Sequence, residues 1–564
     1  MLKCVFLDKN VRNRTIKCLK KIKKILTIYK MCYIIALKNR ENIKNKQNTQ
    51  IIEQNRTQND NNNKGKDEDM SSFYILGIDQ STQGTKAVLF DKYGKIIARA
   101  DEAHKQIVSD QNWVSHDLEE IYANVIKASR QVVEKAGIDK KQIVCVGIDN
   151  QRETTAAWNR KTGKPVADAI VWQCSRAKDI CKRIDENGVS GEKIYRRTGL
   201  KLSPYYPAGK MAWFLENVPG ARELAEYGEL ALGTMDSWLV YKLTGGKEFR
   251  TDYSNASRTQ LMDIKNLVWD KEMCDLFQIP MNVLPQICDS DSTFGYTDLE
   301  GYLDKEIPIC GILGDSHGAL YGHNCRQAGG IKTTYGTGSS VMMNTGETPF
   351  FSEHGLSTSL AWRIKGKVSY VLEGNINYTG AVISWLKDKL HMISSPGETE
   401  ELAKKADPND HTYIVPAFSG LGAPWWRDDI YASISGMSRT TGREEIVRAG
   451  CDCIAYQIND VIEAMRKDSQ IDISQMCVDG GPTRNKYLMQ FQSDISQTEI
   501  KIPDAEELSV IGAGYLAGEA AGYYDPDDIY KAITYNFFET KMQERERSEK
   551  IYGWNEAVKM LLNK

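Results

Sequence analysis

Short apolar segments of this chain repeatedly end in an acidic residue or in a glycine-rich turn. Residues 73–79, 307–315 and 476–481 each consist of an apolar run followed directly by Asp or Gly. Apolar runs of this length, bounded by turn residues, are typical of buried strands. Because the pattern occurs in both halves of the chain, it predicts an internally duplicated α/β protein whose small polar loops meet at one cleft.

Helical spacing of apolar residues predicts helices between such strands. Residues 118–136 form one, with Gly137 as its C-cap, before an apolar strand at 143–148. Residues 444–467 predict a long amphipathic helix, and 509–523 a helix rich in Gly and Ala. Alternating strands and helices favour a mostly parallel sheet covered by helices.

Composition and charge restrict the class of protein. The 564 residues are 26% charged and 41% hydrophobic, as in a soluble globular chain long enough for two or more domains. The formal net charge of −2 combines +10 in residues 1–69, from 17 Lys and Arg against 7 Asp and Glu, with −12 in the remainder. An acidic body argues against a nucleic-acid partner, which needs a concentrated excess of Lys and Arg.

The 13 cysteines are odd in number and form no CxxC pair. They therefore indicate reduced cytoplasmic thiols, not a disulfide or zinc framework.

Residues 1–69 differ from the rest in composition, since Lys, Asn and Ile dominate and residues 47–69 are almost entirely polar. Such a stretch buries too little apolar surface to order itself. Its apolar part, 25–37, is interrupted by Lys30 and is too short for a membrane span. We expect a disordered or non-native extension, with Met70 as the biological start and a cytoplasmic location.

The loop after the first strand combines an acid, hydroxyls, glycine and a lysine. Asp79 ends the strand, Thr82 lies in the loop and Lys86 begins the next strand. A carboxylate in this position can hold Mg²⁺ through water while backbone N–H groups and the lysine face phosphate oxygens. The alternative is an ordinary turn.

Two loops of the second half are further candidates for phosphate or purine contact. Residues 335–339 surround a Gly-Thr-Gly turn, and 479–485 place two glycines between a strand and a helix. A backbone without Cβ atoms allows close approach of a ligand. The alternatives are a hairpin turn and a plain helix start.

Asp315 is the strongest single candidate for a catalytic residue. It follows a buried strand, has small neighbours and opens a helix, whose N-terminus favours an ionised carboxylate. The alternative is an N-cap aspartate. Arg152 and Glu153 also follow a strand and offer donors and an acceptor to neighbouring hydroxyls, unless they form a surface ion pair. The histidines show no metal-ligand spacing and are interpreted as structural.

Across residues 73–560, eight segments in order resemble the FGGY carbohydrate kinases, and within them most closely the glycerol kinases. The segments are 77–82 (GIDQST), 150–155 (NQRETT), 170–173 (IVWQ), 233–239 (GTMDSWL), 251–258 (TDYSNASR), 335–338 (YGTG), 420–426 (GLGAPWW) and 478–481 (VDGG). The resemblance implies two actin-like (RNase H-like) α/β ATPase domains, at 70–325 on the substrate side and 326–564 on the ATP side. It also implies ATP and Mg²⁺ as cofactors, and it leaves open a homodimer or homotetramer.

The resemblance also implies roles for individual residues. Asp315 matches the catalytic base and Asp79 the metal-linked acid. The positions that match ATP contacts are Thr82, Lys86, Thr337, Gly380, Ser384, Gly481 and Asn485. The positions that match polyol contacts are Arg152, Glu153, Trp172 and Tyr205, with Asp315, Ser316 and Ser340 beside them. The implied reaction is in-line transfer of the ATP γ-phosphoryl group to a substrate hydroxyl.

Three departures from the glycerol kinase pattern concern the substrate. Ser316 replaces a Gln, Ser340 replaces a Phe, and Cys174-Ser175 replaces an Asp-Arg pair. Two of these changes shrink a side chain, so the sequence leaves open a polyol or ketose of four to six carbons beside glycerol. An actin-like ATP-binding scaffold without a small substrate is the alternative from another class.

Overall fold

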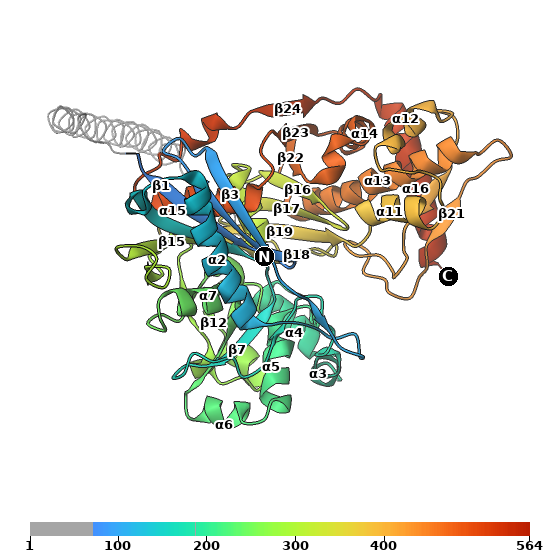
Figure 1. The fold of residues 1–564 in the computed structure, drawn as a ribbon. Helices are drawn as coiled ribbons and strands as arrows, with labels where there is room; N and C mark the ends of the chain where they lie inside the picture. Colours follow the sequence, from blue (N-terminus) through green and yellow to red (C-terminus); the bar gives the residue numbers. More distant parts are fainter. Residues whose placement is uncertain (1–71, 187, 564) are drawn as a thin grey trace, which may run out of the picture. The chain divides into compact units, whose positions relative to one another are not determined.

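The structure is a computed structural model that describes residues 72–186 and 188–563, so the expectation for residues 1–69 lies outside it. The first large sheet, of which Figure 1 labels β15, β1 and β3, has the strand order β14-β15-β6-β1-β2-β3. Its strands are β14 (Gly295–Thr297), β15 (Ile307–Gly314), β6 (Ile143–Asn150), β1 (Tyr74–Gln80), β2 (Gly84–Phe90) and β3 (Ile96–Ala103).

The second large sheet has the order β18-β19-β17-β16-β22-β23-β24. Its strands are β18 (Ser357–Ile364), β19 (Lys367–Ile376), β17 (Ser339–Gly346), β16 (Ile331–Tyr335), β22 (Gln475–Asp479), β23 (Glu499–Pro503) and β24 (Tyr535–Phe538). In both sheets, three neighbouring antiparallel strands, β3-β2-β1 and β19-β17-β16, are followed by two strands that each run parallel to the one before. This shared order is the internal duplication that the sequence predicts.

The expectation of a mostly parallel sheet is wrong, because both sheets are mixed. β2 pairs antiparallel with both β1 and β3, and β17 pairs antiparallel with both β16 and β19. The connections explain this. Only a few residues separate β1 from β2 and β16 from β17, and such short turns can join only antiparallel strands. The parallel pairs are those that a longer, helix-containing crossover connects.

Helices cover the sheets in alternating layers. The helix α2 (Leu118–Ala136) packs on one face of the first sheet, against Leu76, Ile78 and Leu89. Between the two sheets lie α10 (Asp315–Gly322) and α15 (Leu508–Ala520), which share one apolar core with β1 and β17. The helix α13 (Arg443–Ser469) packs on the far face of the second sheet. The predicted helices therefore exist, although the last one ends at Ala520 and not at 523.

Close approach of α15 to the first sheet depends on glycine. A Cβ on Gly147 of β6 would lie 2.3 Å from the Ala513 carbonyl oxygen, and one on Gly512 would lie 1.9 Å from that of Gly318. Because α15 comes from the C-terminal part of the chain yet packs on the N-terminal sheet, it connects the two halves. The division at residues 325 and 326 stays a prediction.

A third, five-stranded sheet with its own apolar core lies beside the first sheet, in the lower part of Figure 1. Its strands are β4 (Ile107–Val108), β5 (Val114–His116), β8 (Ala169–Ile170), β7 (Thr155–Asn159) and β9 (Leu230–Thr234). The short strands are β10 (Arg250–Asp252), β11 (Met262–Asp263), β12 (Val268–Trp269), β13 (Gln286–Cys288), β20 (Tyr413–Val415) and β21 (Ser433–Ser435).

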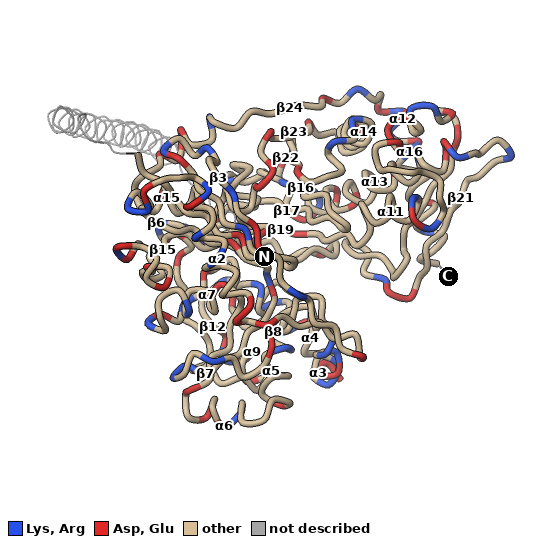
Figure 2. Tube along the Cα trace, viewed as in Figure 1, with Lys and Arg blue, Asp and Glu red and all other residues tan. Residues whose placement is uncertain are grey.

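The remaining helices are α3 (Lys178–Ile184), α4 (Ser190–Thr198), α5 (Pro207–Asn217), α6 (Ala221–Glu226), α7 (Met235–Leu243), α8 (Tyr253–Ala256), α9 (Lys271–Leu276), α11 (Gly380–Asp388), α12 (Glu398–Lys405), α14 (Lys486–Ser496) and α16 (Glu544–Leu562). Of these helices, α5, α6 and α7 contact the third sheet, α11, α12 and α14 contact α13, and α8 packs on β18. Among the described residues, no helix has the length and apolar character that crossing a membrane requires. Positions of Lys and Arg alternate with positions of Asp and Glu along the described chain, as the colours of the backbone tube show (Figure 2).

Candidate active site

Three adjacent parallel strands, β1, β6 and β15, end at one edge of the first sheet. Asp79 near the end of β1 is the register partner of Asp149 in β6, and Asp315 follows the last residue of β15. Adjacent carboxyl ends bring their side chains together, which is the usual place for a ligand in such sheets. The structure therefore brings Asp79 and Asp315 to the same sheet edge, as the sequence predicts.

Asp79 and Lys86 face each other across the β1–β2 hairpin. Lys86 Nζ lies 3.2 Å from Asp79 Oδ2 and 2.8 Å from Glu507 Oε2. Burial raises the pKa of Asp79, and Lys86 opposes that effect. Burial disfavours the ammonium of Lys86, but Asp79 and Glu507 raise its pKa overall. The lysine is thus a fixed cation at the first loop. Glu507 lies more than 400 residues away in the chain, so no local sequence pattern pointed to it.

Asp149 is a second carboxylate beside Asp79. Its side chain is fully buried, and neither oxygen has a hydrogen-bond partner among the described residues. Burial raises the pKa of Asp149 well above its usual range, with a further contribution from Asp79. An unpaired buried carboxylate is costly unless a cation compensates it. The carboxylates of Asp79 and Asp149 therefore fit a Mg²⁺ ion, which prefers oxygen ligands such as carboxylates.

These carboxylates cannot bind such an ion alone. Among residues 72–186 and 188–563, no group of three or more His, Cys, Asp and Glu could hold a metal. Asp79 and Asp149 would supply part of the coordination, and phosphate oxygens and water would complete it, as is common for Mg²⁺.

Asp315 is the first residue of α10, and its side chain is 38% exposed. The N-cap is Gly314, so the interpretation of Asp315 as an ordinary N-cap is wrong. Arg152 Nε donates to Asp315 Oδ1 at 3.1 Å, and Arg152 Nη2 donates to Ser316 Oγ at 3.1 Å. A carboxylate held by a guanidinium at a sheet edge, and still open to solvent, can receive a proton from a bound ligand.

Arg152 and Glu153 are buried and do not form the surface ion pair that was considered as their alternative. Arg152 binds Glu373 with both terminal nitrogens, at 2.7 and 3.2 Å. Glu153 binds Arg258 Nε at 2.5 Å, and Arg258 also pairs with Glu373 at 2.7 Å. The four residues form one buried network of alternating charge.

Glu373 is the centre of this network. Burial disfavours its charge, yet Arg152 and Arg258 together hold the pKa of Glu373 well below its usual range. Ser340 Oγ also donates to Glu373, at 3.2 Å, so Ser316 and Ser340 contact the same network from two sides. Glu373 was not predicted as a site residue, although a lone carboxylate in an apolar strand is a signal for a buried partner.

Trp172 and Tyr205 lie next to this network and to the first loop. Their rings make an edge contact with centroids 5.7 Å apart. Trp172 Nε1 donates to Thr82 Oγ1 at 2.9 Å, which joins the predicted polyol residues to the predicted phosphate loop. All the predicted polyol residues are therefore within one connected cluster.

The Gly-Thr-Gly turn between β16 and β17 packs against the start of α11. The Thr337 carbonyl oxygen accepts from the backbone N–H groups of Thr379 and Ala381, and the Gly336 carbonyl accepts from Gly380, each at 3.0 Å. Thr337 itself is exposed. The contact fixes this turn relative to α11.

A cavity of about 520 Å³ brings four of the predicted ATP residues together. They are Gly380 and Ser384 of α11, Gly481, and Asn485, which caps α14. Asn485 Oδ1 accepts from the Leu488 N–H, and its Nδ2 donates to Thr399 Oγ1, each at 3.0 Å. The cavity is mostly apolar with a few polar groups, which suits a flat purine.

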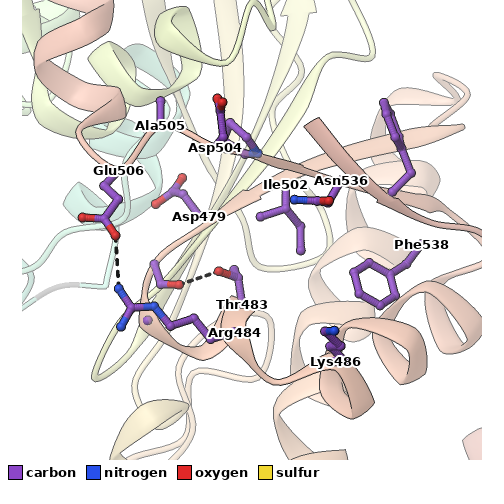
Figure 3. Close-up of a pocket in the computed structure, with 14 residues that line it drawn as sticks. Asp479, Thr483, Arg484, Lys486, Ile502, Asp504, Ala505, Glu506, Asn536 and Phe538 are labelled. Atoms are coloured by element: carbon purple, nitrogen blue, oxygen red, sulfur yellow. Dashed lines mark hydrogen bonds and ion pairs between the residues drawn. The ribbon is translucent and has the colours of Figure 1, made fainter. Parts of the chain in front are cut away.

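A second, larger cavity of about 800 Å³ shares Gly481 and Arg484 with the first (Figure 3). Its lining includes Asp479, whose carboxylate accepts from Thr334 Oγ1 at 3.1 Å and lies 2.7 Å from His323 Nε2. Burial lowers the basicity of His323, but Asp479 raises its pKa overall, to about 9. The histidine thus anchors the residue that precedes the glycine loop, a structural role as expected.

Replacing Gly380 by alanine tests the geometry of the first cavity. The added Cβ would lie 2.5 Å from the Gly336 carbonyl oxygen, so α11 must move away from the Gly-Thr-Gly turn. We expect the KM for ATP to rise at least about tenfold, because small displacements of binding groups are costly. Gly442→Ala is the control, since its Cβ would meet the flexible Glu445 side chain at an ordinary 3.4 Å and Gly442 is not among the residues that line this cavity. Equal KM values for the two variants would contradict the prediction.

Family models match most of the chain. The N-terminal domain of the FGGY family of carbohydrate kinases matches residues 74–322, and its C-terminal domain matches residues 331–521. Among curated proteins, glycerol kinase 1 of Thermotoga maritima is 47% identical over 491 residues, which are 87% of this chain and 99% of that protein. The glycerol kinase of Bacillus subtilis is 43% identical over 490 residues, which are 86% of this chain and 98% of that protein.

Solved structures agree. The crystal structure of Plasmodium falciparum glycerol kinase with ADP is 36% identical, with a TM-score of 0.82 over 87% of this chain and 98% of that chain. Gluconate kinase from Lactobacillus acidophilus, at 21% identity, has a TM-score of 0.78 over 87% of this chain and 98% of that chain. The predicted fold class, two actin-like (RNase H-like) domains, is confirmed. With both family domains matched in order, this chain belongs to the FGGY family of carbohydrate kinases.

Proposed function

We propose that this protein transfers the γ-phosphoryl group of ATP to a hydroxyl of glycerol, giving glycerol 3-phosphate, in the cytoplasm. The observation that carries the proposal is the position of Asp315, which lies beside a buried Arg152 in a cluster of polyol-binding residue types. Relatives that are named glycerol kinases, 42–47% identical over nearly their whole length, support the choice of substrate.

Glycerol would be held by four residues with different chemistry. The Arg152 guanidinium supplies donors and the Glu153 carboxylate an acceptor, so together they can bind neighbouring hydroxyls. Trp172 and Tyr205 would cover the carbon chain with their rings, which already contact each other at the site. Because Arg152 is fixed by Glu373 and Glu153 by Arg258, the donors and acceptor are preorganised.

Asp315 would act as the general base. Its Oδ1 is held by Arg152, while the carboxylate remains 38% exposed and can reach a bound hydroxyl. As the hydroxyl oxygen attacks the γ-phosphorus, its proton passes to the Asp315 carboxylate and ADP leaves with the bridging oxygen. Arg152 keeps the carboxylate in place throughout.

ATP would bind across the two sheets. Gly380, Ser384, Gly481 and Asn485 line the cavity that fits the base, and Thr337, Thr82 and Lys86 would face the phosphates. Asp79 and Asp149 would hold Mg²⁺, which neutralises charge on the phosphoryl oxygens when bound. Lys86 adds a fixed positive charge on the same side.

One observation favours a second candidate, a polyol or ketose of four to six carbons. Ser316 and Ser340 are small, and their hydroxyls contact the Arg152–Glu373 pair directly. A site lined by short hydroxylated side chains can hold additional substrate hydroxyls. Within residues 72–186 and 188–563, no structural feature favours an ATP-binding scaffold without a small substrate.

An ADP-release assay over a panel of acceptors tests the proposal. Glycerol, erythritol, dihydroxyacetone and pentoses are compared by kcat/KM, with MgATP held constant. We expect glycerol to have the highest kcat/KM. A longer substrate that turns over while glycerol is inactive would replace the proposal by the second candidate.

A further inference from the structure

A buried lysine outside the cluster described above contacts three of its members. Lys210 lies in α5 and is 0% exposed. Its Nζ donates to the backbone carbonyl oxygens of Glu153 at 3.0 Å, Trp172 at 3.2 Å and Tyr205 at 2.5 Å. A protonated amine has three N–H donors, and here each finds one acceptor.

The three acceptors come from separate parts of the chain. Glu153 lies in the loop after β6, Trp172 follows β8, and Tyr205 precedes α5. The β7–β8 pairing at Thr155 and Ile170, and the hydrogen bond from the Trp172 N–H to Thr154 Oγ1 at 3.1 Å, hold the first two segments beside each other, whereas Tyr205 lies outside the described strands. Burial lowers the pKa of Lys210 to about 7, yet all three partners are acceptors, so the contacts fit the protonated amine, which holds the three carbonyls at one point without using their side chains.

The backbone at Glu153 needs such support. Its φ is +60°, in the left-handed region that side-chain-bearing residues rarely adopt. Strained backbone persists only where the surroundings hold it. The Glu153 carbonyl is held by Lys210 and its carboxylate by Arg258, so the residue is fixed from both sides.

We propose that Lys210 is a positioning residue for the polyol site: its ammonium sets the spacing of Glu153, Trp172 and Tyr205 and so controls the affinity for the acceptor substrate. The inference rests on the proposed function, because these three residues are the ones proposed to hold glycerol. Lys210 itself touches no substrate, since its amine is completely enclosed.

The test compares the full-length wild type with Lys210→Met, which keeps the length of the side chain but removes its donors. We expect the KM for glycerol to rise at least about tenfold, since displaced binding groups lose much of their effect. We expect the KM for ATP to change less than about twofold, because no residue of α5 lines the nucleotide cavity. Hydrogen exchange should quicken in peptides that contain residues 151–155 and 172, with or without glycerol.

The control is Val558→Ala, a cavity-forming change in α16 within the apolar core on the far face of the second sheet. It lowers stability without touching the polyol site, so the KM for glycerol should not change. The proposal would be overturned if the KM for glycerol rose equally in both variants. It would also be overturned if hydrogen exchange in the peptides that contain residues 151–155 were the same in Lys210→Met as in the wild type.

Chemical rescue gives a second test that a structural role alone would not pass. In Lys210→Ala, propylammonium should lower the KM for glycerol and propanol should not. Where Lys210→Met fails to fold, Lys210→Gln takes its place, and an unchanged KM there would overturn the proposal. A wild type that does not phosphorylate glycerol would refute the proposed function, whereas the exchange measurement would still decide the role of Lys210.

Discussion

Replacing Asp315 by asparagine is expected to lower kcat for glycerol phosphorylation by about 10²- to 10⁴-fold, the range typical of general-base catalysis. Asparagine keeps the shape and can still accept a hydrogen bond from Arg152, but it cannot take the proton of the attacking hydroxyl. Because the Asp315 side chain is 38% exposed, the free energy of unfolding should hardly change. Steady-state kinetics and thermal unfolding of the variant check the two statements.

Asp304→Asn is the matched control for this prediction. Asp304 lies on the surface, in the segment between β14 and β15. Its Oδ1 pairs with Lys140 Nζ at 2.7 Å. Its replacement should leave kcat unchanged. Turnover of Asp315→Asn within about tenfold of the wild type would contradict the assignment of Asp315 as the base.

Replacing Glu373 by glutamine is expected to lower the free energy of unfolding by about 3 kcal/mol, because it leaves two buried guanidinium groups without their shared carboxylate. The Glu373 side chain is 0% exposed and lies 2.7 Å from both Arg152 and Arg258. With Arg152 displaced, the KM for glycerol should rise as well. Urea-induced unfolding measures the first effect, and steady-state kinetics the second.

Glu549→Gln in α16 is the control. Glu549 pairs with Arg545 at 3.0 Å, but both side chains are largely exposed, so the expected change is below about 1 kcal/mol. Equal unfolding free energies for the two variants would show that the Glu373 network contributes no more than a surface ion pair.

Strand ends were the most predictable part of this molecule. The runs that end at Asp79, Asp315 and Asp479 are short, apolar and bounded by turn residues, and they form β1, β15 and β22. The helices with clear 3.6-residue periodicity also occur within a few residues of the expected bounds, since that signal depends on local sequence alone.

Strand direction could not be inferred in the same way. Alternating strands and helices suggested a mostly parallel sheet, but the short turns after β1 and β16 reverse the chain and make both sheets mixed. The lengths of these two loops indicate that the strands are antiparallel, whereas the pattern of apolar runs says nothing about strand direction.

The partners of the site residues were the least predictable part. Arg152 and Glu153 are neighbours in sequence, yet each binds a residue more than 100 positions away, Glu373 and Arg258. Lys210 and Glu507 likewise act on residues far from them in the chain. No spacing rule relates such positions, because only the folded chain brings them together.

The transfer of the ATP γ-phosphoryl group to glycerol is tested most directly by ³¹P NMR of a single reaction that contains the wild type, MgATP and excess glycerol. We expect the γ-phosphate signal of ATP to be replaced by that of glycerol 3-phosphate, with one ADP formed for each product molecule. Inorganic phosphate in place of a phosphoester, or ATP that remains intact, would contradict it.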